Sequence, residues 1–213
     1  MGRDERSAFL TRVYGAKDRD ELRSIYDDWA GSYEADLSSW GYIGPALAVG
    51  LIARHLEPDQ GPFLDAACGP GHLGSMLHLL GYRGLVAIDL SPGMLVQARA
   101  RGVYSECLEM ALGEPLDFPD DRFAMTAALG VFTAGHAGPE AFDELLRVTR
   151  PGGLLLFSLS DAVYEAGGFK ARLEALSEAG RVALLDASDW ALVITDYPGE
   201  SPPRHRLFAY RLL

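Results

Sequence analysis

Two short stretches of this chain combine glycines with an acidic side chain, and together they could form a ligand-binding site. Residues 63–74 read FLDAACGPGHLG, so an apolar run ends at Asp65 and glycines follow. Residues 88–95 read IDLSPGML, with Asp89 at the end of a second apolar run. Glycines let a ligand lie directly on the backbone, and the free N–H groups at a helix start attract an electron-rich group. The two stretches therefore predict a strand, a ligand-binding turn and a helix, with a carboxylate nearby.

The spacing alone leaves two ligand classes open. Residues 69–74 match G-x-G-x-x-G, and Asp89 follows Gly69 by 20 positions, which suits the ribose of a dinucleotide or of S-adenosylmethionine (SAM). Asp65 favours SAM, because a carboxylate in the turn would repel a pyrophosphate but could orient the charged amino-acid end of SAM. The position of the turn also favours SAM, because dinucleotide domains commonly begin with such a turn and here about sixty residues precede it. Only about eighty residues follow Phe132, which is little for a separate substrate domain. The proline-rich turn and strand at the chain end also suit a sheet closed by an antiparallel hairpin.

Three side chains are candidates for moving a proton. His136 follows the strand predicted over residues 124–129, on the expected ligand edge, and could act as a base near neutral pH. An exposed loop histidine without a catalytic part is the alternative. Tyr26 and Tyr33 are the other candidates, and both belong to an aromatic segment, residues 26–37, that is expected to be one helix. This segment predicts a lid or pocket wall, with packing on the sheet edge as the alternative.

The composition excludes several classes of protein. The net charge of −11 argues against nonspecific binding to nucleic acids or anionic membranes. Cys68 and Cys107 form no C-x-x-C pair, so neither a zinc site nor a disulfide framework is expected, and Cys68 is interpreted as a packing residue. No His/Asp/Glu cluster has the spacing of a metal site. No secretory signal and no apolar run of about 18 residues is visible, so we expect a cytoplasmic protein.

The elements that must position these residues alternate along the chain. Apolar runs predict strands that begin at Phe63 and then cover residues 85–89, 106–110, 124–129, 154–159, 182–186 and 207–212. Helical patterns lie between them, and residues 130–138 are expected to be a flexible connection. The alternation predicts an α/β fold, a doubly wound Rossmann-like sheet that is mostly parallel with an antiparallel last strand. We expect one domain over residues 1–213, with a helical lid and first helix in 1–60 and the binding core in 61–213.

These motifs resemble those of the class I SAM-dependent methyltransferases of the small-molecule type. Residues 64–71 resemble the first motif of that family, with Ala67 where a glycine is usual, and residues 88–95 resemble its second motif. The chain opening is also similar to the methyltransferase-like family of the Williams–Beuren region and its bacterial relatives. Further segments that resemble the family are residues 26–33, 41–45, 118–123 and 150–154.

The resemblance implies how SAM would be held. Asp89 would bind the ribose, and the adenine ring would lie between Leu90 and Met94. Gly113 would offer its backbone N–H to the adenine, and Leu112 stands where the family often has an acidic residue. The full set of cofactor-binding residues implied in this way, or expected from the turn and the lid, is Tyr33, Asp65, Ala67, Gly69, Gly71, Asp89, Leu90, Met94, Leu112, Gly113, Leu129 and Gly130.

The predicted function is methyl transfer from SAM to an oxygen or nitrogen atom of a small molecule. Leu129–Phe132 read LGVF, so the chain does not resemble the amino-group nucleobase methyltransferases, which usually have a Pro-Pro-aromatic motif at this place. No metal cofactor is expected. The expected partner is the small-molecule acceptor, without nucleic acid or membrane, and the oligomeric state is left open. Alternatives are a protein-directed or RNA-directed methyltransferase, an NAD-dependent oxidoreductase, and a noncatalytic SAM-binding or protein-interaction module.

Overall fold

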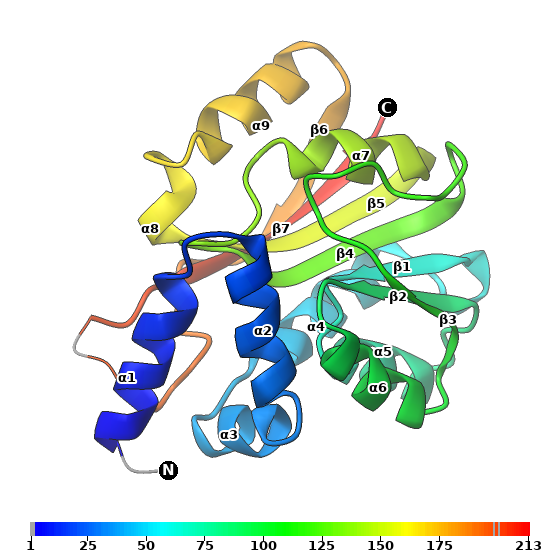
Figure 1. Cartoon of the computed structure of the whole chain (residues 1–213). Coiled ribbons are helices and arrows are strands. Elements are labelled where there is room, and N and C mark those ends of the chain that lie inside the picture. The colour runs from blue at the N-terminus through cyan, green and yellow to red at the C-terminus, as the bar shows by residue number, and fades with distance from the viewer. Residues whose placement is uncertain (1–2, 198, 200) are drawn as a thin grey trace.

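The computed structural model describes residues 3–197, 199 and 201–213 of the chain (Figure 1). Met1 and Gly2, on which the expectation of no secretory signal partly rests, lie outside the described residues. Pro198 and Glu200, in the proline-rich turn before the last strand, also lie outside them. Across the described ranges, no helix is long and apolar enough to cross a membrane.

The predicted sheet is present in the described part of the chain. Seven strands there pair in the order β3-β2-β1-β4-β5-β7-β6. The pairs among the first five strands are parallel, whereas the last strand of the chain is antiparallel to both of its neighbours. The predicted fold class is therefore confirmed. The strands are β1 (Phe63–Ala66), β2 (Leu85–Asp89), β3 (Tyr104–Glu109), β4 (Phe123–Phe132), β5 (Thr149–Ser160), β6 (Val182–Ala187) and β7 (His205–Leu212).

Helices cover both faces of this sheet because successive side chains of each strand point to opposite faces. The flanking helices are α4 (Gly44–His55), α5 (His72–Leu79), α6 (Pro92–Ala100), α7 (Ala141–Val148) and α9 (Phe169–Glu178). Leu64 and Ala66 of β1 pack into a core cluster with α7 and α9. Phe63 packs into the opposite cluster with α4 and α5. Figure 1 shows this division, with α7 and α9 on one side of the strands and α4, α5 and α6 on the other.

Two short helices and the extension of one strand differ from the sequence prediction. The short helices η1 (Pro58–Gln60) and α8 (Asp161–Tyr164) were not predicted. β4 continues to Phe132, so the expected connection over residues 130–138 is wrong at its start. The register of β4 on β5 shifts between Ala128 and Phe132, and Gly130 has a φ of 72° at that shift. A glycine tolerates this left-handed conformation, so the strand can bend there without ending.

The aromatic segment forms two helices rather than the single helix expected over residues 26–37. The N-terminal helices are α1 (Arg3–Tyr14), α2 (Arg19–Trp29) and α3 (Tyr33–Ser39). The chain turns at residues 30–32, and Gly31 lies in that turn. The three helices share an apolar cluster of their own, which includes Leu10, Leu22 and Trp29. In Figure 1 they lie together beside the carboxyl end of the parallel strands, where a lid is expected.

Ion pairs join one face of α2 to the end of β3 and to the loop that follows it. Arg19, Arg23 and Asp27 are spaced four residues apart and therefore share a helix face. Arg19 forms an ion pair with Glu114, and Arg23 forms one with Glu109 at 2.8 Å. These exposed ion pairs contribute little stability individually, but they orient the helix across the end of the sheet.

Asp27 attaches α2 to the start of α6. Its Oδ1 accepts hydrogen bonds from the Ser91 hydroxyl at 2.5 Å and from the Gly93 backbone N–H at 2.9 Å. The Ser91 oxygen in turn accepts the Met94 N–H, so Ser91 is the predicted N-cap of α6. The two helices touch at Gly93, where a β-carbon would lie 3.2 Å from the Asp27 Cα. The lid is thus fixed through the cap of a core helix.

Replacing Asp27 should loosen the lid without unfolding the core. In Asp27→Ala, Ser91 and Gly93 lose their shared acceptor, at a cost of about 1–3 kcal/mol. We expect faster amide hydrogen exchange in α2 and unchanged exchange in β1, β4 and β5. Asp28→Ala is the matched control, because Asp28 is the exposed neighbour of the same type. Equal exchange in the two variants would contradict the anchoring role of Asp27.

Candidate active site

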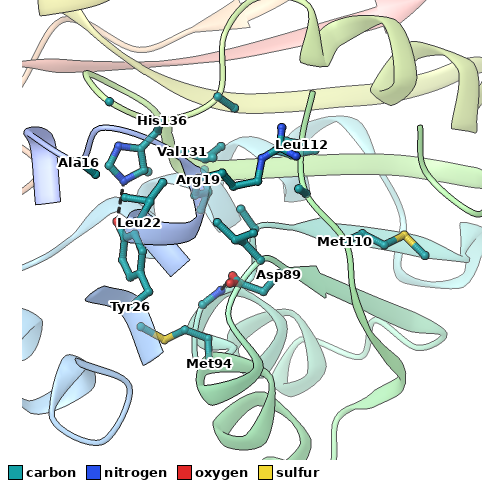
Figure 2. Close-up of a pocket in the computed structure, with 18 of the residues that line it drawn as sticks. Ala16, Arg19, Leu22, Tyr26, Asp89, Met94, Met110, Leu112, Val131 and His136 are labelled. Atoms are coloured by element: carbon teal, nitrogen blue, oxygen red, sulfur yellow. Dashed lines mark hydrogen bonds between the residues drawn. The ribbon is translucent and has the colours of Figure 1, made fainter. Parts of the chain in front are cut away.

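A cavity of about 440 Å³ lies between α2 and the carboxyl end of the sheet. Its floor consists of the glycine turn after β1, the end of β2 and the bend in β4. Its other walls are residues 16–19 at the start of α2, the segment 110–112 after β3, and the loop around His136. Figure 2 shows Leu22 and Tyr26 of α2 facing Asp89 and Met94 across this space.

The cavity gathers most of the residues singled out from the sequence. The three proton-transfer candidates, His136, Tyr26 and Tyr33, all line it. The cofactor candidates that line it are Tyr33, Ala67, Gly69, Asp89, Leu90, Met94, Leu112, Leu129 and Gly130. Residues from six separate parts of the chain therefore meet in one place, as the α/β topology requires of a ligand site.

Asp89 is the charged centre of the cavity floor. Its Oδ2 accepts the Gly69 N–H at 2.8 Å and its Oδ1 accepts the Ser91 N–H at 2.9 Å. The carboxyl is 9% exposed, and burial raises its pKa to about 6, although these backbone N–H groups act to lower it. Each carboxylate oxygen keeps a second lone pair that a bound hydroxyl can use.

The backbone of the glycine turn is open toward the cavity. Gly69 has a φ of 53°, and a β-carbon at that position would meet nothing within 4 Å. Ala67 also has a positive φ, 57°, which explains why a glycine is usual in this position of the motif. The conformation leaves backbone at the cavity wall, so a ligand can lie directly against the turn.

Tyr26 and His136 form a hydrogen-bonded pair on the opposite wall. The Tyr26 hydroxyl and His136 Nε2 are 2.8 Å apart, and His136 Nδ1 is 2.8 Å from the Ala134 carbonyl oxygen. A carbonyl only accepts, so Nδ1 carries the proton and Nε2 accepts the hydroxyl of Tyr26. Burial lowers the pKa of His136 and raises that of Tyr26, so both are neutral at pH 7. Figure 2 marks this contact with a dashed line.

Comparisons with known proteins agree with this geometry. The methyltransferase domain family matches residues 63–153. Human methyltransferase-like protein 27 is 34% identical over 179 residues, which are 81% of this chain and 73% of that protein. Malonyl-[acyl-carrier protein] O-methyltransferase from Serratia marcescens is 34% identical over 151 residues, which are 70% of this chain and 56% of that enzyme.

The chain belongs to the class I SAM-dependent methyltransferases. Solved structures share the fold of this methyltransferase. A TehB-like SAM-dependent methyltransferase from Corynebacterium glutamicum has a TM-score of 0.62 at 18% identity, covering 89% of this chain and 99% of that one. An S-adenosylmethionine-dependent methyltransferase from Mesorhizobium loti has a TM-score of 0.58 at 19% identity, covering 76% and 96%.

Family membership decides between the ligands that the glycine spacing left open. The cofactor of this methyltransferase is SAM, and its second substrate is a methyl acceptor. The cavity fits that cofactor, because the open backbone at Gly69 and the Asp89 carboxylate face the same space. The dinucleotide-dependent oxidoreductase and the noncatalytic module are thereby set aside. In the described part of the chain, no group of three or more His, Cys, Asp or Glu residues could hold a metal ion.

Three predicted cofactor residues lie outside the cavity wall of the described chain: Asp65, Gly71 and Gly113. The Asp65 carboxylate accepts the Tyr104 hydroxyl at 2.6 Å and is used inside the fold. A β-carbon at Gly71 would lie 2.9 Å from the Tyr104 ring, and one at Gly74 would collide with it. Two glycines of the motif therefore make room for Tyr104 rather than for the ligand.

The sequence missed several residues of the cavity wall. Residues 16–19, at the start of α2, carry no apolar period and no motif that would place them at a ligand. Val131, Ala137 and Glu140 follow the bend in β4, within or beyond the segment interpreted as a loop. Their only signal was proximity to His136 in the sequence, which does not specify orientation.

The Asp65–Tyr104 contact predicts a pH-dependent stability. Burial raises the pKa of Asp65 to about 6, so above that pH an ionised carboxylate depends on the Tyr104 donor. Tyr104→Phe should therefore cost about 1–3 kcal/mol at pH 8 and less at pH 5, where Asp65 is protonated. Urea denaturation at both pH values tests this expectation.

Tyr82→Phe is the matched control for that measurement. Tyr82 is also buried, but its hydroxyl donates to the Leu56 carbonyl at 2.7 Å, an acceptor that does not titrate. Its loss should cost the same free energy at pH 5 and pH 8. If the cost of Tyr104→Phe is equally independent of pH, Asp65 is not the titrating partner.

Proposed function

We propose that this methyltransferase transfers the methyl group of SAM to an oxygen or nitrogen atom of a small molecule. The observation that carries this proposal is the Tyr26–His136 pair, which lines the same cavity as Asp89 and Gly130. An O–H or N–H acceptor loses a proton when it is methylated, and a neutral imidazole beside the cofactor site can take it. The Serratia marcescens relative is named for methylation of an oxygen.

In this proposal the chain acts as one domain, residues 1–213, in which residues 1–60 cover a core formed by residues 61–213. The lid supplies Leu22 and Tyr26 to a cavity whose floor comes from the core. Enclosure of this kind excludes water and holds an acceptor in position, which is most of what a methyl transfer requires of the protein. The net charge of −11 disfavours an RNA acceptor.

Asp89 is proposed to bind the ribose hydroxyls with the lone pairs that its backbone contacts leave free. Leu90 and Met94 would contact the adenine ring, and Gly69 would lie under the methionine part. When bound, SAM supplies an electrophilic methyl group on a positively charged sulfur. Leu129 and Gly130 would border that group, so the acceptor atom must approach from the side of Tyr26 and Tyr33.

His136 is the proposed proton acceptor, and Tyr26 the group through which the proton moves. The Tyr26 hydroxyl donates to His136 Nε2, so its oxygen has lone pairs free to accept a hydrogen bond from the acceptor. As the acceptor loses its proton to Tyr26, the hydroxyl proton passes to Nε2. The Ala134 carbonyl, already bonded to Nδ1, stabilises the resulting imidazolium. Tyr33, whose ring centroid is 6.3 Å from that of Tyr26, would help to hold the acceptor.

Removing the Asp89 carboxylate should weaken cofactor binding. We expect Asp89→Ala to lower the affinity for SAM and its product S-adenosylhomocysteine (SAH) at least tenfold, about 1.4 kcal/mol, by loss of charge-assisted hydrogen bonds. Calorimetric titration with SAH and with NAD measures this. Asp59→Ala, an exposed aspartate of η1, is the control and should leave the affinity unchanged. Unaltered SAH affinity in Asp89→Ala, or tight NAD binding to the native protein, would refute the assignment.

The proposed base predicts the acid limb of the pH profile. Burial lowers the pKa of His136 from 6.5, so its base form persists below that pH. With an acceptor found by screening with tritiated SAM, kcat/KM should stay constant from pH 8 to 6.5 and fall only at lower pH. His136→Ala should slow turnover by about 10²-fold or more and leave SAH affinity alone.

His55→Ala is the control for that experiment. His55 lies on α4 with its Nε2 3.3 Å from Asp186, outside the cavity wall. Its removal should change neither turnover nor SAH affinity. An acid limb at or above pH 6.5, or full turnover in His136→Ala, would remove His136 from the mechanism.

A further inference from the structure

A second, smaller chamber of about 60 Å³ adjoins the main cavity. Tyr26, Tyr33 and Gly130 line both spaces, so the chamber begins where the methyl group of SAM is proposed to lie. It extends between the lid helices and the carboxyl ends of β4 and β5. Since a water molecule needs about 10–15 Å³ on this measure, there is room for roughly four to six water-sized groups. The chamber suits the end of a small molecule that enters from the main cavity.

The walls of the chamber are uncharged. Among the described residues that line it there is no aspartate, glutamate, lysine or arginine. Leu10, Val13 and Ile194 give it an apolar side, and Tyr14 and Tyr42 contribute phenol rings. Burial raises the pKa of Tyr42 to about 12, so this hydroxyl stays protonated at neutral pH. A carboxylate or ammonium group in this chamber would lose its hydration without gaining an opposite charge.

One polar atom in this wall is unsatisfied. His205 begins β7 and is 7% exposed, and within the described residues its Nδ1 has no hydrogen-bond partner. A neutral imidazole has one N–H donor and one lone-pair acceptor, so Nδ1 can donate or accept a hydrogen bond, depending on the tautomer. Burial lowers the pKa of His205, which keeps the ring neutral.

A buried polar atom without a hydrogen-bond partner is rare in proteins, because it loses its bond to water and gains nothing in return. Here the atom belongs to a side chain that lines a chamber beside the reacting position. A hydroxyl or an uncharged amine on a ligand would supply the missing partner in either tautomer, because each group can both donate and accept a hydrogen bond.

We propose that this chamber holds one end of the methyl acceptor, that this end is an uncharged hydroxyl or amine, and that it forms a hydrogen bond with His205 Nδ1. This inference rests on the proposed function and narrows the class of acceptor. His205 is a binding residue in this scheme, whereas His136 takes the proton. The neighbouring polar wall residues Thr133 and Ser158 would contact the same end of the acceptor.

Fluorine NMR titrations of the SAH-saturated protein test the chamber directly. The probes are 4-fluorophenol, 4-fluorotoluene, 4-fluorobenzoate and 4-fluorobenzylammonium, which differ in one substituent on the same ring. We expect 4-fluorophenol to bind at least about fivefold more tightly than each of the other three, because it alone carries an uncharged group that can form a hydrogen bond. Equal binding of the phenol and the toluene, or a preference for either ion, would overturn the proposal.

Variants at His205 assign the effect to its Nδ1. His205→Phe should reduce 4-fluorophenol binding to the level of 4-fluorotoluene, and His205→Asn should keep part of the preference because its amide can still form a hydrogen bond. His78→Phe is the matched control: His78 also has a buried Nδ1 without a partner in the described chain, but lies on α5 outside both cavities. SAH affinity should be unchanged in all three. A preference that survives in His205→Phe would overturn the proposal.

The measurement separates this inference from the proposed function. If the ring probes show no preference for the phenol and a screened small molecule is still methylated, the chamber assignment fails and the function stands. If the preference depends on His205 and no screened small molecule is methylated, the chamber assignment stands and the function is in question. Should His205→Phe fail to fold, the selectivity of the native protein and of His205→Asn decides the outcome.

Discussion

The Asp89 carboxylate is the contact on which the rest of the site depends. Its two oxygens accept the N–H groups of Gly69 and Ser91, so one side chain fixes both the glycine turn and the start of α6. The Ser91 hydroxyl then donates to Asp27 of the lid. Because burial raises the pKa of Asp89, these donors help to keep its carboxylate ionised. The glycine turn, the start of α6 and the N-terminal helices are therefore coupled through one buried charge.

The glycine motif divides its work between the ligand and the fold. Gly69 leaves its backbone open to the cavity, whereas Gly71 and Gly74 make space for the Tyr104 ring. Tyr104 reaches from β3 to Asp65 on β1, across the intervening β2, and so fixes the turn from beneath. A sequence motif records that a position must be glycine, but not which neighbour requires it. This is why the motif alone does not show which of its residues line the cavity.

Local sequence patterns predicted the fold well, but they predicted poorly which residues line the chamber beside Tyr26 and Tyr33. Continuous apolar runs such as Leu85–Asp89 identified the buried strands, and Ser91 identified a helix start. The bend of β4 at Gly130 and the break before Tyr33 depend on tertiary contacts, so the sequence placed neither boundary correctly. The chamber joins α1 to residues of β5 and β7 more than 100 positions away, among them His205. The hydrophobic periodicity of a segment does not show which distant residues it will contact in the folded chain.

Two neutral histidines face this site, because burial lowers the pKa of His136 and of His205. The Ala134 carbonyl accepts the Nδ1 proton of His136, so Nε2 of that ring accepts the Tyr26 hydroxyl. The Nδ1 atom of His205, by contrast, has no hydrogen-bond partner among the described residues. The tyrosines cannot replace His136 as a base, because burial, with smaller contributions from Asp89, keeps the pKa of Tyr26 and of Tyr33 raised. One histidine is therefore already bonded to a lid tyrosine, whereas the other still needs a partner that an uncharged polar group of the acceptor molecule can supply.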